Sequence, residues 1–534
     1  MQHWTKKAVF YHIYPLGFCG APAENTQSES VERLDQLLNW IPYWKRLGVN
    51  AIYLGPIFAS SRHGYDTSDY YQIDPRLGTR ERFSQICNVL HQQGFRMILD
   101  GVFNHVGRNF WAFQDVQQNK EASPYCNWFE NLNFKGDSPY GDPFWYEGWE
   151  GHYDLVKLNL SNPDVVDHLL GAVNMWIDEF QIDGLRLDAA NHVRLDFLRQ
   201  LRDMTKQKKP DFWLMGEIIH GDYNIWANST HLDSVTNYEC YKGIYSSHHD
   251  HNYFEIAHSL NRQFAESGIY RTIDTYNFLD NHDVNRIAST LHNPNHIFNA
   301  YTTLFTMPGI PSIYNGSEFA LPGKKEHGSD QTLRPPLSPS DATDRYPELQ
   351  QHISTLSTIR KTFPSIQKGA YQSIVIRNEQ LLYRRFTNEQ TVYVALNLSD
   401  SAASFDFSIG SSHLLEVFSE ETLTACQSQI SITVPPCSAK ILLETNGEPI
   451  SLSFQSQPVA LQEESTNTPS SSQHEESTGW YQDRNGYRYN LVAFASDAQT
   501  REPLVVYHLE EETKHLLVLP KNAFFEALSK AENE

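Results

Sequence analysis

The pattern of hydrophobic and polar positions divides the chain into regions of different character. From residue 8 to about 365, short runs of β-branched and aromatic residues alternate with helical stretches. This alternation is typical of repeated strand–helix units that build a parallel sheet. From 366 to 445, strand-like segments follow one another without helices between them, which predicts an antiparallel β-domain.

Eight runs in the first region have the length and composition of barrel strands. They lie at 9–13, 50–54, 96–100, 182–188, 212–217, 233–238, 275–280 and 310–314. Eight parallel strands with intervening helices predict a (β/α)8 TIM barrel over residues 1–365. The catalytic groups of such a barrel are expected just after each run, at the carboxyl end of the strand.

The connection between the third and fourth predicted strands is too long for a single helix. It holds a helical pattern at 164–180 and roughly fifty further residues, more than an ordinary loop contains. We therefore predict a small domain inserted at 106–160, on the catalytic side of the barrel. Its many aromatic rings suit either stacking on sugar rings or the core of the insertion itself. They include Trp111, Tyr125, Trp128, Phe134, Phe144, Trp145, Tyr146, Trp149 and Tyr153.

The second region is predicted to be a compact antiparallel β-domain, preceded by a helix with apolar residues at every third or fourth position. Its expected strands are 371–376, 381–386, 392–398 and 430–434. Residues 446–478 are polar and of low complexity, which predicts a linker without fixed structure. A small accessory domain is expected at 479–534, with strands at 487–495 and 504–509 and then a short helix.

Charge and composition limit the classes of partner. The chain has 42 Lys and Arg residues against 64 Asp and Glu, a formal net charge of −22, and 40% of its residues are hydrophobic. A globular chain of this charge repels nucleic acid and anionic membranes, so we expect neither as a partner. No apolar run approaches the ~18 residues of a membrane span. A neutral substrate therefore fits best.

The cysteines and the first residues of the chain bear on its location. The six cysteines are scattered without metal-binding or disulfide-rich spacing, which favours free thiols in a reducing cytoplasm. Lys6 and Lys7 before a partly apolar stretch imitate a leader peptide, but His12 and Pro15 interrupt that stretch. We expect a first barrel strand there and a cytoplasmic protein.

Acidic clusters follow four of the predicted strands. They lie at 100–105, 184–188, 216–217 and 278–283. A single Asp at a strand end is most often a cap or an ion-pair partner. A barrel, however, brings strands three, four, five and seven to one rim. Three carboxylates, an Arg and two His in one cleft are costly for stability, which indicates a catalytic site.

The four clusters resemble, in order, the signature regions of the alpha-amylase superfamily of retaining glycoside hydrolases. Residues 48–56, 63–70 and 309–318 resemble further segments of the same family, so the likeness extends over about 8–445. The resemblance implies double displacement, with Asp188 as nucleophile, Glu217 as general acid/base and Asp283 as a third carboxylate that grips sugar hydroxyls. The carboxyl groups of Asp188 and Glu217 are then expected about 5–5.5 Å apart.

The resemblance also implies four substrate-binding residues. Arg186 lies two residues before Asp188, on the same face of the strand, and is expected to hold that carboxylate ionised. His105 and His282 match histidines that hydrogen-bond the sugar at the cleavage point, and Tyr65 matches a ring that stacks on it. Asn104 matches a position that binds calcium in many relatives, but the other ligands would lie in the variable insertion. We therefore predict no metal site and no organic cofactor, with calcium left open.

Subfamily features of the sequence point in two directions. Residues 156–160 resemble the neopullulanase and cyclomaltodextrinase branch, whereas 188–192 and 280–283 look more like ordinary alpha-amylases or oligosaccharide hydrolases. Enzymes of the cyclomaltodextrinase branch usually carry an N-terminal β-domain that builds a dimer, while the barrel pattern here begins at residue 8. This difference counts against small-ring specificity and that dimer, and it leaves the oligomeric state open.

The segment at 479–534 resembles a small bacterial domain of unknown function. Trp480 and Tyr481 are candidates for glucan binding, and an interaction module or a plain appended domain are the alternatives. Glucan binding there would mean that loss of 446–534 raises KM on starch but not on maltotriose.

The sequence therefore predicts a cytoplasmic hydrolase of α-1,4-glucosidic bonds in malto-oligosaccharides and related α-glucans, with cyclodextrins and pullulan as further candidate substrates. The first alternative is a 4-α-glucanotransferase of the same fold, in which a sugar hydroxyl replaces water. The second is a non-catalytic glucan-binding or transporter-accessory protein, and the presence of Asp188 and Glu217 counts against it.

Overall fold

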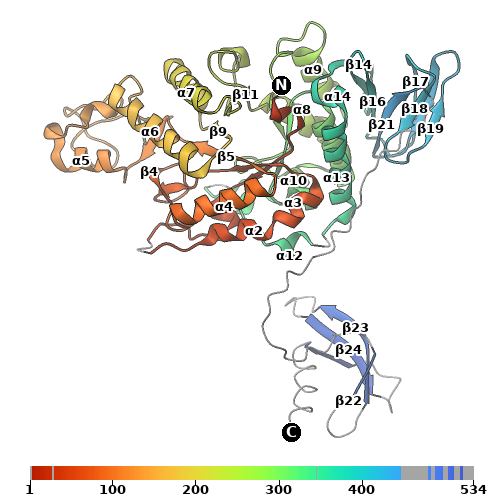
Figure 1. Cartoon of the computed structure of the whole chain (residues 1–534), viewed down its shortest axis with the longest axis horizontal. Coiled ribbons are helices and arrows are strands. Elements are labelled where there is room, and N and C mark those ends of the chain that lie inside the picture. The colour runs from red at the N-terminus through yellow and green to blue at the C-terminus, as the bar shows by residue number, and fades with distance from the viewer. Residues whose placement is uncertain are drawn as a thin grey trace. The chain divides into compact units, whose positions relative to one another are not determined.

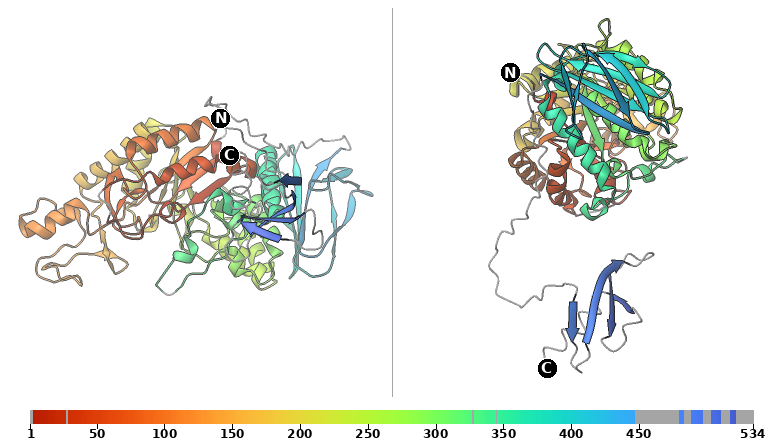
Figure 2. Two further views of the ribbon diagram at one scale, coloured as in Figure 1. Left: turned by 90° about the horizontal axis from the view of Figure 1, so that it is seen from below. Right: turned by 90° about the vertical axis from the view of Figure 1, so that its right-hand side faces the viewer.

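The computed structural model describes residues 3–26, 29–326, 328–343 and 345–446, together with four strands between 479 and 520. The chain forms two compact units, Met1–Gln455 and Ser456–Glu534. The first unit contains the barrel, the insertion and the antiparallel β-domain, with the insertion and the β-domain at opposite ends (Figures 1 and 2). The segment 447–478, predicted as a linker, lies outside the described residues.

The first unit is built around a sheet of eight parallel strands. These are β1 (Phe10–Ile13), β2 (Ala51–Leu54), β5 (Arg96–Gly101), β9 (Gly184–Leu187), β10 (Trp213–Gly216), β11 (Ser234–Val235), β12 (Tyr276–Phe278) and β13 (Ile310–Tyr314). Their order is β11-β10-β9-β5-β2-β1-β13-β12. A parallel bridge between Thr236 and Tyr276 joins the two end strands and closes the barrel. Each strand coincides with one of the eight predicted runs, so the predicted TIM barrel is confirmed.

Alternation along the strands separates two layers of packing. One set of side chains, including Phe10, Tyr53, Ile98 and Trp213, fills the barrel interior as a cluster of its own. The intervening set packs outward against the helices. The longer helices are α4 (Arg80–Gln92), α6 (Pro163–Phe180), α7 (Leu195–Lys208), α8 (Tyr238–His249), α9 (Phe254–Phe264), α11 (His296–Thr306) and α13 (Pro347–Thr362). Shorter ones are α1 (Pro15–Phe18), α2 (Gln36–Asn39), α3 (Ile41–Leu47), α10 (Ile287–Thr290), α12 (Pro339–Ala342) and α14 (Pro364–Lys368).

The insertion forms a small sheet and a helix at the catalytic end of the barrel. Strands β6 (His105–Gly107), β8 (His152–Lys157) and β7 (Gly148–Trp149) pair in that order, and α5 spans Trp111–Asn119. Before it, β3 (Phe58–Ser60) and β4 (Thr67–Ile73) form a hairpin. Most aromatic rings of the insertion build its own core: Trp128, Phe144 and Tyr146 are buried. Trp149 reaches the cavity described below, whereas Trp111, Tyr140 and Trp145 are exposed.

The β-domain has twice as many strands as the sequence predicts. Strands β14 (Ala370–Ile376), β15 (Gln380–Phe386), β16 (Thr391–Asn397), β18 (His413–Glu416), β19 (Thr422–Thr424) and β21 (Ser438–Thr445) form one antiparallel sheet. β17 (Ala403–Ser408) and β20 (Gln429–Val434) form a second sheet. A shared apolar cluster, which includes Tyr393 and Leu442 from the first sheet and Phe405 and Ile432 from the second, makes the domain a sandwich.

The second unit contains an antiparallel sheet of four described strands. They are β22 (Gly479–Gln482), β23 (Arg488–Ser496), β24 (Pro503–Leu509) and β25 (Leu517–Pro520). β23 and β24 correspond to the two predicted strands, and the predicted final helix lies outside the described residues. Within the described part of the chain, no helix is both long and apolar enough to cross a membrane.

Candidate active site

A cavity of about 760 Å³ opens where the barrel strands end. Of the seven predicted site residues, five line it, and the other two, Arg186 and His282, lie directly beneath it in contact with lining residues. The five are Tyr65, His105, Asp188, Glu217 and Asp283. They come from loops after β2, β5, β9, β10 and β12, so closure of the barrel brings together residues that are far apart in the sequence.

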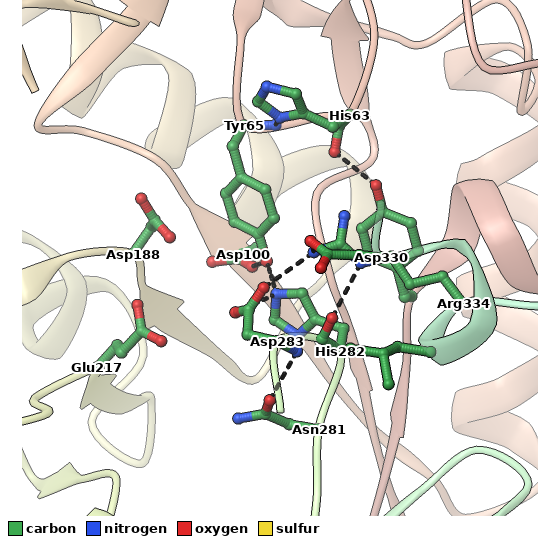
Figure 3. Close-up of polar contacts among 12 residues, drawn as sticks. His63, Tyr65, Asp100, Asp188, Glu217, Asn281, His282, Asp283, Asp330 and Arg334 are labelled. Carbon is green, nitrogen blue, oxygen red and sulfur yellow. Dashed lines mark hydrogen bonds and ion pairs between the residues drawn. The ribbon is translucent and has the colours of Figure 1, made fainter. Parts of the chain in front are cut away.

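Arg186 is the buried cation that organises the carboxylates. Its Nη1 donates to Asp100 and to Asp188, at 3.0 Å from an oxygen of each. Its Nη2 lies 2.8 Å from Oε1 of Glu217. The two ends of one planar guanidinium therefore hold Asp188 and Glu217, and Figure 3 shows these two side chains adjacent at the edge of the site.

The electrostatic environment differs between the two carboxylates. Burial raises the pKa of Asp188 well above its usual range, and the charge of Arg186 opposes that shift. Glu217 accepts hydrogen bonds from the hydroxyl of Tyr238 at 3.2 Å and from the backbone N–H of Ala189 at 3.3 Å. The positive charge of Arg186 thus favours the ionised form of Asp188. Glu217, in contrast, also accepts hydrogen bonds from two uncharged donors.

Tyr65 is fixed by contacts on its hydroxyl and its ring. The hydroxyl donates to Asp100 at 3.1 Å and also contacts Nε2 of His282. The ring is parallel to that of His282, with centroids 5.5 Å apart, and the ring of Tyr14 is also parallel to His282, with centroids 5.6 Å apart. These contacts therefore fix the orientation of Tyr65, which lines the cavity (Figure 3).

The two predicted histidines are buried and neutral. Burial lowers the pKa of His105 to about 3 and that of His282 well below its usual value. Among the described residues, Nε2 of His105 and Nδ1 of His282 have no hydrogen-bond partner. Nε2 of His105 lies 3.8 Å from Oδ2 of Asp188, so this unpartnered nitrogen faces the Asp188 carboxylate.

Asp283 lies in an ion-pair network that the sequence analysis did not identify. Nη2 of Arg334 lies 2.9 Å from Oδ1 of Asp283 and 2.9 Å from Oδ2 of Asp330, and Oδ2 of Asp283 lies 3.0 Å from Nε2 of His282 (Figure 3). Arg334 follows a short 3-10 turn (Gln331–Leu333) in the loop after β13, where no strand or helix pattern marks it. Tyr238 was also missed, although it ends a predicted strand.

Asn104, the position that the resemblance links to calcium, lies buried beside His105. The buried Asn104 side chain contacts Nδ1 of His105 at 3.2 Å. In the described ranges, no group of three or more His, Cys, Asp or Glu residues is arranged to hold a metal ion.

Comparison with known proteins identifies the family. The family described as alpha amylase, catalytic domain, matches residues 12–357, and that described as maltogenic amylase, C-terminal domain, matches 371–441. A cyclomaltodextrinase of a Bacillus species is 30% identical over 74% of this chain and 73% of that protein. An intracellular maltogenic amylase of Bacillus subtilis is 33% identical over 60% of this chain and 57% of that protein.

A solved structure supports the same conclusion. The cyclic alpha-maltosyl-(1→6)-maltose hydrolase from Arthrobacter globiformis has a TM-score of 0.70 and 26% identity, over 83% of this chain and all of that one. The family match covers well over half of the chain, and the barrel and β-domain lie where the two family domains match. The chain belongs to the alpha-amylase family of glycosidases.

Proposed function

We propose that this enzyme hydrolyses α-1,4-glucosidic bonds in malto-oligosaccharides and related α-glucans with retention of the anomeric configuration. Cyclodextrins and pullulan are further candidate substrates. The proposal is supported by relatives named for cyclomaltodextrins, maltose release and a cyclic maltosyl-maltose. We also propose that it acts in the cytoplasm, which is supported by its six free cysteines and by a relative named as intracellular.

The first chemical step breaks the glycosidic bond. The ionised carboxylate of Asp188 attacks the anomeric carbon and forms a glycosyl ester as the bond to the leaving oxygen breaks. Glu217 enters this step protonated and gives its proton to the leaving oxygen, so the shortened sugar departs as an alcohol. The ion pair of Arg186 with Asp188 keeps the nucleophile charged despite its burial.

The second step releases the sugar from the enzyme. Glu217, now a carboxylate, takes a proton from water, and the oxygen of that water attacks the anomeric carbon. The ester bond breaks, its electron pair returns to Asp188, and Glu217 is protonated again. Two inversions at one carbon give net retention.

The remaining groups would bind the sugar at the cleavage point. Tyr65 offers a fixed ring face for stacking, and Asp283 offers carboxylate oxygens to sugar hydroxyls. His105 lines the cavity and is neutral, and among the described residues its Nε2 has no partner, so it can exchange a hydrogen bond with a hydroxyl without adding charge. We propose the same role for His282, which is neutral and lies beneath the cavity. Neutral imidazoles suit a neutral substrate that develops positive charge at the anomeric carbon.

The observation that carries the proposal is the clamp of Arg186 on both Asp188 and Glu217. A single guanidinium that contacts two carboxylates keeps them near one another, as a retaining mechanism requires. The separation of about 5–5.5 Å between the two carboxyl groups stays a prediction.

A product profile over time tests the proposal. The purified enzyme is given maltotriose, maltoheptaose, β-cyclodextrin, pullulan and soluble starch in separate reactions, and the products are separated by chromatography. Short linear products without any lengthened species would support hydrolysis, and the fastest reaction would name the preferred substrate. Products longer than the starting sugar would instead assign glucanotransferase activity. If the enzyme cleaves none of the five substrates, the proposed substrate class is refuted.

A further inference from the structure

The position of the acid/base fixes the direction of the cleft. Glu217 protonates the leaving oxygen, so the leaving sugars lie on its side, next to Ile219, His192 and Tyr238 of the cavity wall. The donor sugars, which stay attached to Asp188, extend the other way. Figure 3 shows His63, Asp330 and Arg334 on the far side of Tyr65 and Asp283 from Glu217. That side is the donor end.

The donor end is bounded by a loop, residues 61–66, that the fold holds firmly. The buried carboxylate of Asp66 accepts hydrogen bonds from the three consecutive backbone N–H groups of 62–64, at 2.9, 3.1 and 3.2 Å. Backbone carbonyls of the same loop accept from the hydroxyl of Tyr14 and from Arg76, both at 2.7 Å. Buried contacts from several directions therefore make this loop a preorganised wall.

Two contacts tie this wall to the insertion. Nη2 of Arg62 lies 2.7 Å from Oδ2 of Asp154 on β8, and Nδ2 of Asn109 donates to Oγ of Ser61 at 2.8 Å. Asp154 and the neighbour of Arg62, His63, both line the cavity. The ion pair thus lies where the donor side of the cavity ends and joins two elements that are separate in the fold.

We infer that the Arg62–Asp154 pair closes the donor end of the cleft, so that the enzyme cleaves near the non-reducing end and releases a short product of fixed length. This inference rests on the proposed function. The donor keeps its anomeric carbon on the enzyme, so its far end is the non-reducing end of the chain. The cavity of about 760 Å³ has the size of small-molecule sites, so it has room for a few sugar units.

The closed end also disfavours cyclic substrates. A ring has no non-reducing end, so it must leave the cleft on both sides of the cleavage point. Opening the wall should therefore raise kcat/KM on β-cyclodextrin relative to maltotriose. An exposed ion pair contributes up to ~1 kcal/mol, so its loss should change this ratio about two- to fivefold.

The test uses maltoheptaose labelled at its reducing end, together with the ratio of kcat/KM on β-cyclodextrin to that on maltotriose. Arg62→Ala removes the pair, and Arg62→Glu places a like charge opposite Asp154 and should open the wall further. Arg82→Ala is the matched control, because Arg82 forms a similarly exposed ion pair with Asp35 at 2.6 Å and lines no part of the cavity.

We expect the wild type and Arg82→Ala to release one short unlabelled product from the earliest time points. Arg62→Ala, and more so Arg62→Glu, should release longer unlabelled products and raise the β-cyclodextrin ratio. A spread of product lengths from the wild type, or unchanged products and ratio in both Arg62 variants, would overturn the inference while leaving the proposed function intact. Failure of the wild type to cleave either linear substrate would overturn both.

Discussion

Replacing Arg186 with lysine tests how the catalytic carboxylates are held. Arg186→Lys keeps the positive charge but replaces a two-ended guanidinium with one ammonium group. The two nitrogens of Arg186 lie 3.0 Å from Asp188 and 2.8 Å from Glu217. A single ammonium cannot occupy both positions, so at least one charge-assisted contact is lost.

The magnitude follows from the kind of contact that is lost. A hydrogen bond to a charged group is worth about 1.5–3 kcal/mol, so kcat/KM on maltotriose should fall about 10- to 150-fold. The pKa of Asp188 is raised by burial and lowered by Arg186, so a weaker cation lets this pKa rise further. Asp188 reacts in its ionised form, and the acidic limb of the kcat/KM profile should therefore move to higher pH.

The assay is the pH dependence of kcat/KM on maltotriose for the wild type and Arg186→Lys. The neighbouring carboxylates that contact Arg186 influence one another's protonation, so the acidic limb of the kcat/KM profile reports an apparent pKa of the whole cluster and not of Asp188 alone. Arg385→Lys serves as a control for the burial of a lysine, since Arg385 is buried in β15 and donates to the carbonyl of Thr306, away from the cavity. An unmoved acidic limb with near-normal kcat/KM in Arg186→Lys would refute the reasoning.

Three further predictions concern the nucleophile, a buried acid and the second unit. Asp188→Ala should lower kcat on maltotriose by at least about 10³-fold while calorimetry still detects sugar binding; near-normal turnover would refute the nucleophile assignment. Burial raises the pKa of Glu318 to about 7, so its ionisation as pH rises from 5 to 8 should cost the fold about 3 kcal/mol, seen as a falling thermal midpoint. In Glu318→Gln the thermal midpoint should fall much less between pH 5 and 8. An equal fall in the variant would contradict the assignment of this pH dependence to Glu318. Deleting 456–534 should leave kcat/KM on maltotriose unchanged, because the two units are separately compact; lost activity would show that they depend on one another. A raised KM on starch alone would assign glucan binding to the second unit.

The barrel could be predicted because each of its strands carries a local signal. Its strands are short apolar runs buried on both faces, flanked by helices with a clear period, and all eight runs became strands. The β-domain was predicted less completely. In β17, Phe405 and Phe407 alternate with polar residues, a pattern from which this strand could have been predicted. β19, in contrast, is three residues long with little apolar content. Such a strand is specified by its partner β18 and not by its own sequence.

The candidate site was predictable where its residues follow strands and not where they lie in loops. Asp188 and Glu217 come directly after barrel strands and Asp283 comes in the loop that follows β12, so the topology alone brings them to one rim. Arg334 reaches Asp283 from a loop without periodicity. The aromatic residues of the insertion look alike in sequence, and only the packing of its sheet places Trp149 at the cavity.

The anomeric configuration of the first product tests the central claim most directly. Cleavage of maltotriose is followed by proton NMR from the first minutes, before the newly formed reducing end equilibrates in water. The arrangement of Asp188 and Glu217 around Arg186 predicts that the α-anomer appears first and the β-anomer only later, as mutarotation proceeds. Initial release of the β-anomer would mean inversion and would contradict a covalent intermediate on Asp188.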